Sequence, residues 1–191
     1  MKRLFAMLLA VLMLCGSALA EGMIPFDDYV EVLSEFTDEA WSQDGAELLW
    51  VLEPEAGVTI SVCLEDGRVA ALTAEFPSAD APDTVWMALD ALGILDGGAL
   101  ERIAEMAEDS EAELDGCRVL RLHGRQRDAF CVCTAEDAGN MLWQPIHGGS
   151  KLHDDPACSG MDAARMITEE TAEALGWEDC EKCRASGKSG A

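Results

Sequence analysis

The chain has 191 residues, of which 37 are acidic and 13 basic, so its formal net charge at pH 7 is −24. This length supports one domain of ordinary size with a small addition, and an apolar content of 49% is enough to form a hydrophobic core. A surface this acidic repels phosphate groups, which argues against nucleic acid or an anionic lipid surface as a partner.

Residues 1–20 have the three parts of a secretory signal peptide. Two basic residues stand at positions 2 and 3, an apolar run occupies 4–14, and residues 17–20, Ser-Ala-Leu-Ala, end in the small-x-small pattern that signal peptidase accepts. The apolar run is too short to cross a bilayer, which takes about 20 residues. We therefore expect cleavage after Ala20, no membrane insertion of the mature protein, and a secreted or extracytoplasmic location, at the cell surface or in a periplasm.

Residues 21–140 are predicted to form an α+β body. Asp66-Gly67 is typical of a hairpin turn, and an acidic loop is expected near residues 108–117. The order of elements predicts an antiparallel sheet with helices packed on one face. Apolar spacing predicts helices over 25–41, 83–95 and 99–107, and alternation predicts strands over 47–52, 58–64, 70–76, 118–123 and 128–134.

Seven cysteines follow the predicted leader, and four of them lie in the body. Alternation places these four away from the apolar face of the sheet, which in the last hairpin is assigned to Leu120, Leu122, Phe130 and Val132. Cysteines of exported proteins usually pair. We expect two disulfides that link Cys63 and Cys117 to Cys131 and Cys133, with the pairing open; the alternative is small buried residues under a covering loop, or free thiols.

Basic residues gather in the last predicted hairpin, where His123 accompanies four arginines at positions 118, 121, 125 and 127. Such a local positive charge could hold an anionic ligand. The interpretation we favour is that these arginines pair with the protein's own carboxylates at an exposed edge of the sheet.

Residues 141–185 contain a ligand pattern typical of a zinc site. Four residues separate His153 from Cys158, 21 residues follow, and Cys180 is separated from Cys183 by two residues. A pair of cysteines two residues apart can bind one ion from a single turn, and a second pair then completes a tetrahedron. Three thiolates and one imidazole predict a closed structural Zn²⁺ site; one disulfide plus a free thiol is the alternative.

The segment between the ligand pairs predicts a short helix over 169–175. Thr168 stands at its N-cap and Gly176 at its end, with acidic residues in its first turn. A module of about 40 residues buries little core, so such modules depend on a metal or on disulfides. The last residues, 186–191, are predicted to be a disordered tail.

Residues 148–183 resemble the short His/Cys zinc-binding module of exported Gram-positive bacterial proteins, and they are similar to the metal-binding domain of Ada-type repair proteins. The shared features are the first ligand pair, a Thr-led helix that ends in Gly176-Trp177, and a final Cys-x2-Cys. The resemblance implies Zn²⁺ bound by these four residues. It does not imply DNA repair, because His153 stands where the repair proteins have a reactive cysteine, and acidic residues replace the basic ones that contact DNA.

The sequence favours an exported, non-catalytic binding protein for an unknown protein, peptide or small ligand. Histidine occurs three times, and no nucleophile elbow, phosphate-binding loop or His-Glu-x-x-His motif is present. Two alternatives remain open. One is a surface metal-buffering protein, which predicts more than one metal per chain, and the other is an enzyme without a recognisable motif.

Overall fold

The computed structural model describes residues 23–78, 80–158, 161 and 163–183. The predicted signal peptide at 1–20 and the predicted tail at 186–191 lie outside the described residues. Within the part of the chain that is described, no helix is both long enough and apolar enough to cross a membrane.

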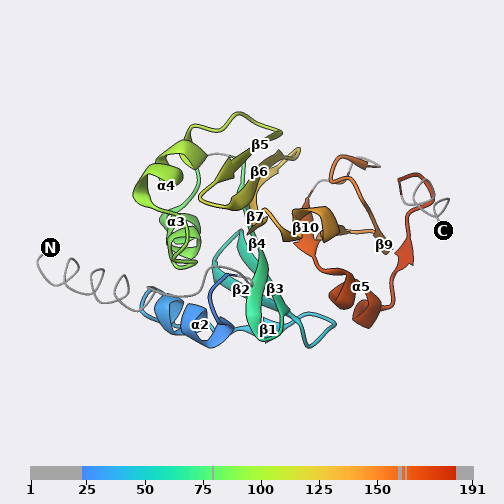
Figure 1. Cartoon of the computed structure of the whole chain (residues 1–191), viewed down its shortest axis with the longest axis horizontal. Helices are drawn as coiled ribbons and strands as arrows, with labels where there is room; N and C mark the ends of the chain where they lie inside the picture. The colour runs from blue at the N-terminus through green and yellow to red at the C-terminus, as the bar shows by residue number, and fades with distance from the viewer. Residues whose placement is uncertain (1–22, 79, 159–160, 162, 184–191) are drawn as a thin grey trace, which may run out of the picture.

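An antiparallel sheet of seven strands lies at the centre of the fold (Figure 1). Its order is β1-β2-β3-β4-β7-β6-β5, so two consecutive meanders meet where β4 pairs with β7. This central pair extends from Ala71 opposite Cys133 to Pro77 opposite Arg127. The strands are β1 (Ser42–Gln43), β2 (Leu49–Glu55), β3 (Val58–Glu65), β4 (Arg68–Pro77), β5 (Ser110–Leu114), β6 (Cys117–His123) and β7 (Arg127–Thr134).

Two tight Asp-Gly turns join strands of the sheet. The predicted turn at Asp66-Gly67 is confirmed, with φ of 49° and 74°, and Asp115-Gly116 repeats it with φ of 51° and 79°. Positive φ at both central residues gives the turn whose twist matches that of the flanking strands. The second turn joins β5 to β6, so the acidic loop expected there is wrong. The edge strand β5 exposes its acidic side chains, which made the segment resemble a loop.

Three helices cover one face of the sheet, as predicted. Their buried residues, including Tyr29, Leu33, Leu89 and Ile103, pack on the large apolar side chains of the strands. Each helix is shorter than its apolar spacing suggests; the first ends at Ser34, whose hydroxyl donates to the carbonyl of Glu31. The helices are α2 (Phe26–Ser34), α3 (Asp83–Asp90) and α4 (Gly97–Ala104).

The C-terminal segment covers the opposite face of the sheet, on the right in Figure 1. β8 and β10 pair in antiparallel fashion, while β9 and β11 pair in parallel. This segment and the sheet bury a second hydrophobic core, to which Leu152, Met166 and Ile167 belong. Its elements are the 3₁₀ helix η1 (Asp137–Asn140), β8 (Leu142–Pro145), β9 (Lys151–Leu152), β10 (Ala164–Ile167), α5 (Glu169–Leu175) and β11 (Glu178–Asp179).

Small side chains form the face of the sheet on which this segment lies, and polar contacts fix its position. The hydroxyl of Thr73 accepts the backbone N–H of Met166 at 3.1 Å, and the sulfur of Cys63 accepts that of Thr168 at 3.3 Å. Thr171, which is fully buried on α5, lies 3.0 Å from the same sulfur. The small residues of this face include Ser61, Cys63, Ala71, Thr73, Ala129, Cys131 and Cys133.

The predicted disulfides in the body are wrong, because Cys63, Cys117, Cys131 and Cys133 are all free thiols. Cys131 and Cys133 are buried beneath the C-terminal segment, and burial raises the pKa of each thiol to about 12. The alternation assigned to β6 is also wrong. Cys117 lies on the helix-covered face, where burial raises its pKa to about 11, and Leu120 lies opposite Cys131 on the other face.

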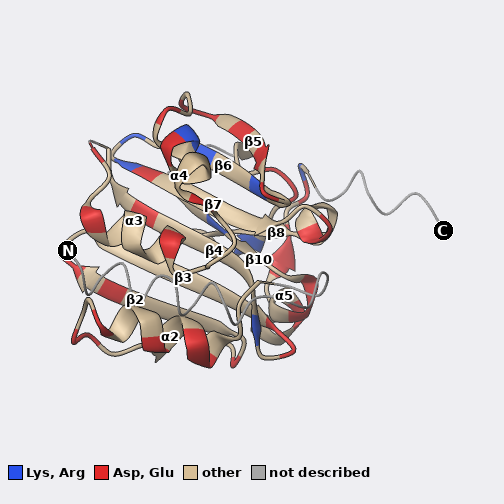
Figure 2. Ribbon diagram, turned by 60° about the vertical axis from the view of Figure 1, so that its left-hand side comes forward, with Lys and Arg blue, Asp and Glu red and all other residues tan. Residues whose placement is uncertain are grey.

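Three arginines of the last hairpin pair with carboxylates of the chain, as the favoured interpretation predicted, but the expected exposed edge is wrong: β5 forms the edge of the sheet, and Glu75 and Asp128 are buried. Figure 2 shows acidic residues spread over helices, loops and strands, with several of the few basic residues near β6. The ion pairs join Arg118 to Glu111 at 2.6 Å, Arg121 to Asp128 at 3.4 Å, and Arg127 to Glu75 at 3.0 Å.

Candidate metal centre

Two short strands bring the predicted ligands together. His153 directly follows β9 and Cys180 directly follows β11, and these strands lie side by side in parallel. The backbone N–H of Cys180 donates to the carbonyl of Leu152 at 2.8 Å. His153 also exchanges two backbone hydrogen bonds with Trp143 on β8, at 2.8 and 2.9 Å. Backbone hydrogen bonds therefore hold the segments that carry His153 and Cys180 next to each other.

The four side chains form one compact cluster. His153, Cys158, Cys180 and Cys183 each place one donor atom within 4.8 Å of all the others. The sulfurs of Cys158 and Cys180 are 3.8 Å apart, and the sulfur of Cys183 is 3.6 Å from Nδ1 of His153. With Zn–S near 2.3 Å and Zn–N near 2.0–2.1 Å, a regular tetrahedron has S–S edges of about 3.8 Å and S–N edges of about 3.6 Å. The cluster could hold a metal ion, and these two of its six donor–donor distances match the tetrahedral lengths.

The surroundings of Cys180 and His153 favour the protonation states that bind metals, whereas those of Cys183 do not. The backbone N–H groups of Lys182 and Cys183 donate to the sulfur of Cys180, and they lower the pKa of this thiol to about 7. The N–H of Asp154 donates to Cys183 at 3.4 Å, although burial raises the pKa of Cys183. Burial also lowers the pKa of His153, which favours its neutral form. Metals bind thiolate and neutral imidazole, so the shifts at Cys180 and His153 are in the direction that favours a bound metal.

The predicted helix between the two ligand pairs is present as α5. The hydroxyl of Thr168 accepts the N–H of Thr171 at 3.2 Å, which confirms the N-cap. Gly176 ends the helix with φ of 65°, a left-handed conformation that glycine adopts without strain. After this turn the chain enters β11, which pairs with β9.

The other two histidines lie outside the cluster. Nε2 of His147 is 2.7 Å from the fully buried carboxylate of Glu75, and Nδ1 of His123 is 2.8 Å from the buried carboxylate of Asp128. The hydrogen bond with Asp128 raises the pKa of His123. Within the described residues, each of these two histidines is thus oriented by a carboxylate.

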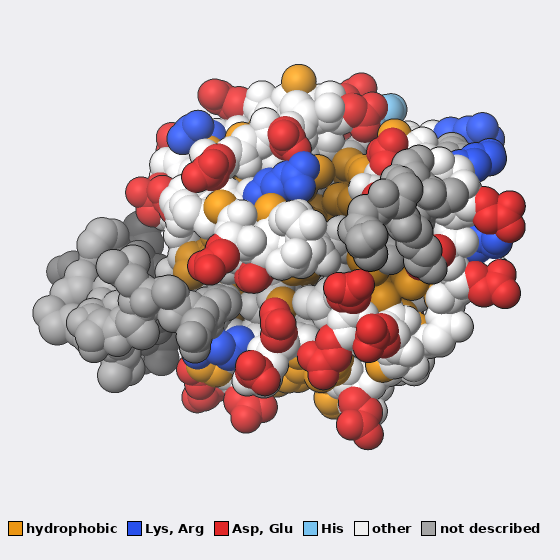
Figure 3. All heavy atoms as spheres, turned by 45° about the vertical axis from the view of Figure 1, so that its right-hand side comes forward, with side chains coloured by type: hydrophobic (Ala, Val, Ile, Leu, Met, Phe, Trp, Pro, Cys, Tyr) orange, Lys and Arg blue, Asp and Glu red, His pale blue; other side chains and the backbone are white. Residues whose placement is uncertain are grey.

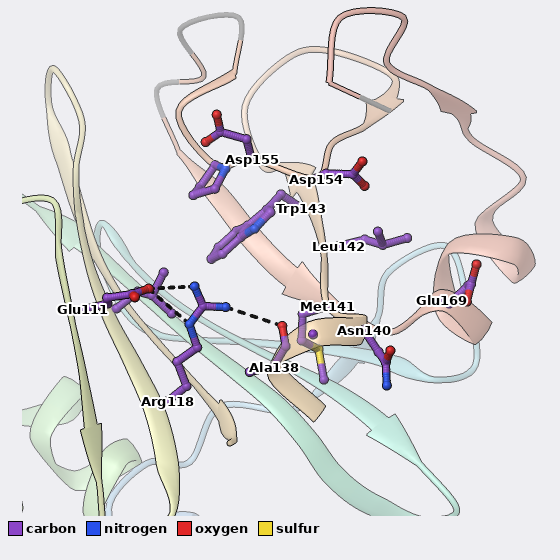
Figure 4. Close-up of a pocket in the computed structure, with 13 residues that line it drawn as sticks. Glu111, Arg118, Ala138, Asn140, Met141, Leu142, Trp143, Asp154, Asp155 and Glu169 are labelled. Atoms are coloured by element: carbon purple, nitrogen blue, oxygen red, sulfur yellow. Dashed lines mark hydrogen bonds and ion pairs between the residues drawn. The ribbon is translucent and has the colours of Figure 1, made fainter. Parts of the chain in front are cut away.

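A cavity that the sequence did not predict adjoins the cluster of candidate metal ligands. It has a volume of about 650 Å³ and lies between β6, η1 and the residues that follow His153. Figure 4 shows Trp143 on one wall and Arg118 on the other, with dashed lines from Arg118 to Glu111 and to the carbonyl of Ala138. No local sequence pattern marks this cavity, because its walls come from parts of the chain that only the fold brings together.

Comparison of the chain with models of known protein families, with curated proteins and with solved structures gives no match. The resemblance of residues 148–183 to His/Cys modules therefore rests on residue types and their spacing. The structure adds that the four expected ligands form one cluster that could bind a metal.

Proposed function

We propose that this chain is an exported, non-catalytic binding protein whose C-terminal segment is stabilised by one structural Zn²⁺ ion. The observation that carries the proposal is the cluster of His153, Cys158, Cys180 and Cys183, whose donor atoms lie within 4.8 Å of one another. Export is inferred from the leader-like residues 1–20.

The ligand set supports zinc in a structural role. Soft thiolates with one imidazole select zinc over the hard cations Ca²⁺ and Mg²⁺, which prefer oxygen ligands. Four protein ligands complete a tetrahedron and leave no open position for water, whereas catalytic zinc keeps one. The ion would link the segments that follow β9 and β11, which carry His153 and Cys180, and it would also hold the loop that carries Cys158.

The surroundings of the other two histidines give them a structural role, which supports a protein that binds and does not catalyse. His123 and His147 are each hydrogen-bonded to a buried carboxylate, and both carboxylates also pair with an arginine. These pairs neutralise buried charge within the sheet.

The cavity beside the four candidate metal ligands offers a concave surface of the size that ligands occupy, and it is the place where we expect a partner to bind.

The test is native mass spectrometry of residues 21–191, prepared under reducing conditions with zinc and then treated with a chelator. We expect one zinc per chain, and we expect the thiols of Cys158, Cys180 and Cys183 to become reactive when the metal leaves. Cys180→Ser should abolish zinc retention, whereas Cys117→Ala, at a buried cysteine outside the cluster, should leave it unchanged. A fully reduced protein that retains no zinc would refute the centre, and two or more ions per chain would favour metal buffering.

A further inference from the structure

Two thiols of the four-residue cluster are close enough to form a disulfide once an ion leaves. The sulfurs of Cys158 and Cys180 are 3.8 Å apart, and 21 residues lie between the two cysteines in the chain. A disulfide has an S–S bond of about 2.05 Å, so closure requires the two sulfurs to approach by about 1.8 Å. A change of one cysteine side chain between staggered rotamers moves its sulfur by more than this distance.

The two cysteines of this pair are held in different ways. Cys158 lies on a turn in which its own N–H donates to the carbonyl of Asp155 at 3.1 Å and the N–H of Ala157 donates to the Asp155 carboxylate at 2.8 Å. Cys180 is buried, and its N–H donates to the carbonyl of Leu152 at 2.8 Å. Because Cys158 is partly exposed, a small oxidant can reach its sulfur, and Cys180 is the buried neighbour placed to attack it.

Cys183 lies against the imidazole of the cluster. Its sulfur is 3.6 Å from Nδ1 of His153, and it accepts the N–H of Asp154 at 3.4 Å. These contacts favour Cys158 and Cys180 as the pair that closes. Three thiols can form only one disulfide among themselves, so Cys183 then remains a thiol.

Closure of this pair would also move one wall of the cavity beside the cluster. Residues 154–156 line that cavity (Figure 4), and they stand between two members of the cluster, His153 and Cys158. The backbone hydrogen bonds between His153 and Trp143 fix one end of this segment. The other end would follow Cys158 toward Cys180, so the cavity would differ between the two states.

The charge of the surface favours an uncharged oxidant. Acidic residues neighbour the ligands directly in the chain at Asp154, Asp179 and Glu181. Figure 3 shows many acidic and few basic side chains on the face that it displays. Such a surface repels anionic oxidants such as glutathione disulfide, whereas a hydroperoxide carries no charge.

From these contacts we infer that the metal centre is a redox-sensitive switch, in which hydrogen peroxide closes a disulfide between Cys158 and Cys180 and releases Zn²⁺. The inference rests on the proposed structural zinc and adds its regulation. The thiolate of Cys158 attacks one peroxide oxygen, which breaks the O–O bond and leaves a sulfenic acid and a hydroxide. The thiolate of Cys180 then attacks that sulfur and expels a second hydroxide. Two thiolates thereby lose two electrons, the peroxide gains two, two protons convert the hydroxides to water, and zinc leaves as Zn²⁺.

The test is a titration of the zinc-loaded protein, residues 21–191, with hydrogen peroxide. A chromogenic chelator reports released zinc, and peptide mapping reports thiols and disulfides. We expect one Zn²⁺ released for each two thiols lost, a disulfide between Cys158 and Cys180, and a Cys183 that still reacts with an alkylating reagent. Dithiothreitol with added zinc should restore the starting state. Retention of zinc in excess peroxide, a Cys180–Cys183 disulfide, or loss of thiols without a disulfide would overturn the inference.

Two serine variants of the reduced, metal-free protein test which sulfurs pair. Cys183→Ser should form the intramolecular disulfide at a rate within twofold of the wild type, whereas Cys180→Ser should form one at least tenfold more slowly. Equal rates in these two variants would overturn the assignment of the pair. Cys117→Ala, at a buried cysteine outside the cluster, is the matched control and should release its zinc as the wild type does.

NMR tests the effect on the cavity. The backbone amide signals of residues 154, 155 and 157 should shift when the protein is oxidised, while those of β3 and β4 stay in place. Unchanged signals at all three positions would overturn the movement of the wall.

Zinc content measured before oxidation distinguishes this inference from the proposed function. If the reduced protein holds one zinc and peroxide does not release it, the switch fails and the structural centre remains supported. If the reduced protein holds no zinc, the proposed metal centre itself fails, and the switch fails with it.

Discussion

Substitution of Ile167 tests whether the C-terminal segment and the sheet unfold as one unit. Ile167 is fully buried on β10 in the core that the segment shares with the sheet. Ile167→Ala removes three carbon atoms, which is about 2.4 kcal/mol at 0.8 kcal/mol each, and the cavity left behind raises the total to about 3–4 kcal/mol. With a urea m-value of about 2 kcal/mol/M, the unfolding midpoint should fall by about 1.5–2 M.

The assay is urea unfolding of the zinc-loaded protein, followed by circular dichroism and by hydrogen exchange of separate peptides. Ile103→Ala is the matched control, since Ile103 is equally buried but lies on α4 in the core on the other face. If the fold is cooperative, both variants should lower one shared transition. A separate early transition confined to residues 141–183 in Ile167→Ala, with β3 and β4 still protected, would refute this reasoning.

Two further predictions concern titratable side chains. Cys131 and Cys133 should resist alkylation in the folded protein at pH 8, because burial raises the pKa of each to about 12, and mass spectrometry should find them labelled only after unfolding. Rapid labelling of either thiol under native conditions would contradict the packing described above. NMR titration should place the pKa of His123 above its ordinary value of about 6.5, and Asp128→Asn should bring it back down. Because the folded state raises this pKa, the stabilisation from His123 should be complete below about pH 6.5 and should be lost as the pH rises through the folded pKa. An unchanged pKa of His123 in Asp128→Asn would contradict the assignment of the shift to Asp128.

The group of four candidate metal ligands could be predicted from the sequence because ligand spacing is a local property. The two residues between Cys180 and Cys183, and the cap and stop of the intervening helix, depend on neighbours in the chain. The turn at Asp66-Gly67 was predictable for the same reason. The sheet with helices on one face followed from the order of apolar patterns, which needs no knowledge of distant contacts.

The faces of β6 and β7 could not be predicted from alternation. Both faces of these strands are buried, one under helices and the other under the C-terminal segment, so apolar residues occupy successive positions. Leu120 and Val119 are then equally good candidates for either face. The disulfide prediction failed because it relied on the expected compartment, whereas these thiols serve as small buried side chains.

The small side chains beneath β10 and α5 have a consequence for protein engineering. Their role is to let a second backbone approach the sheet closely, and alanine or serine would meet the same size limit as cysteine. Replacing Cys131 and Cys133 by alanine and Cys63 by serine, which keeps an acceptor for the N–H of Thr168, should therefore preserve the architecture. With Cys117→Ala added, a protein of residues 21–191 would carry its thiols at Cys158, Cys180 and Cys183 alone, so that every spectroscopic label or redox readout would report on the candidate metal site.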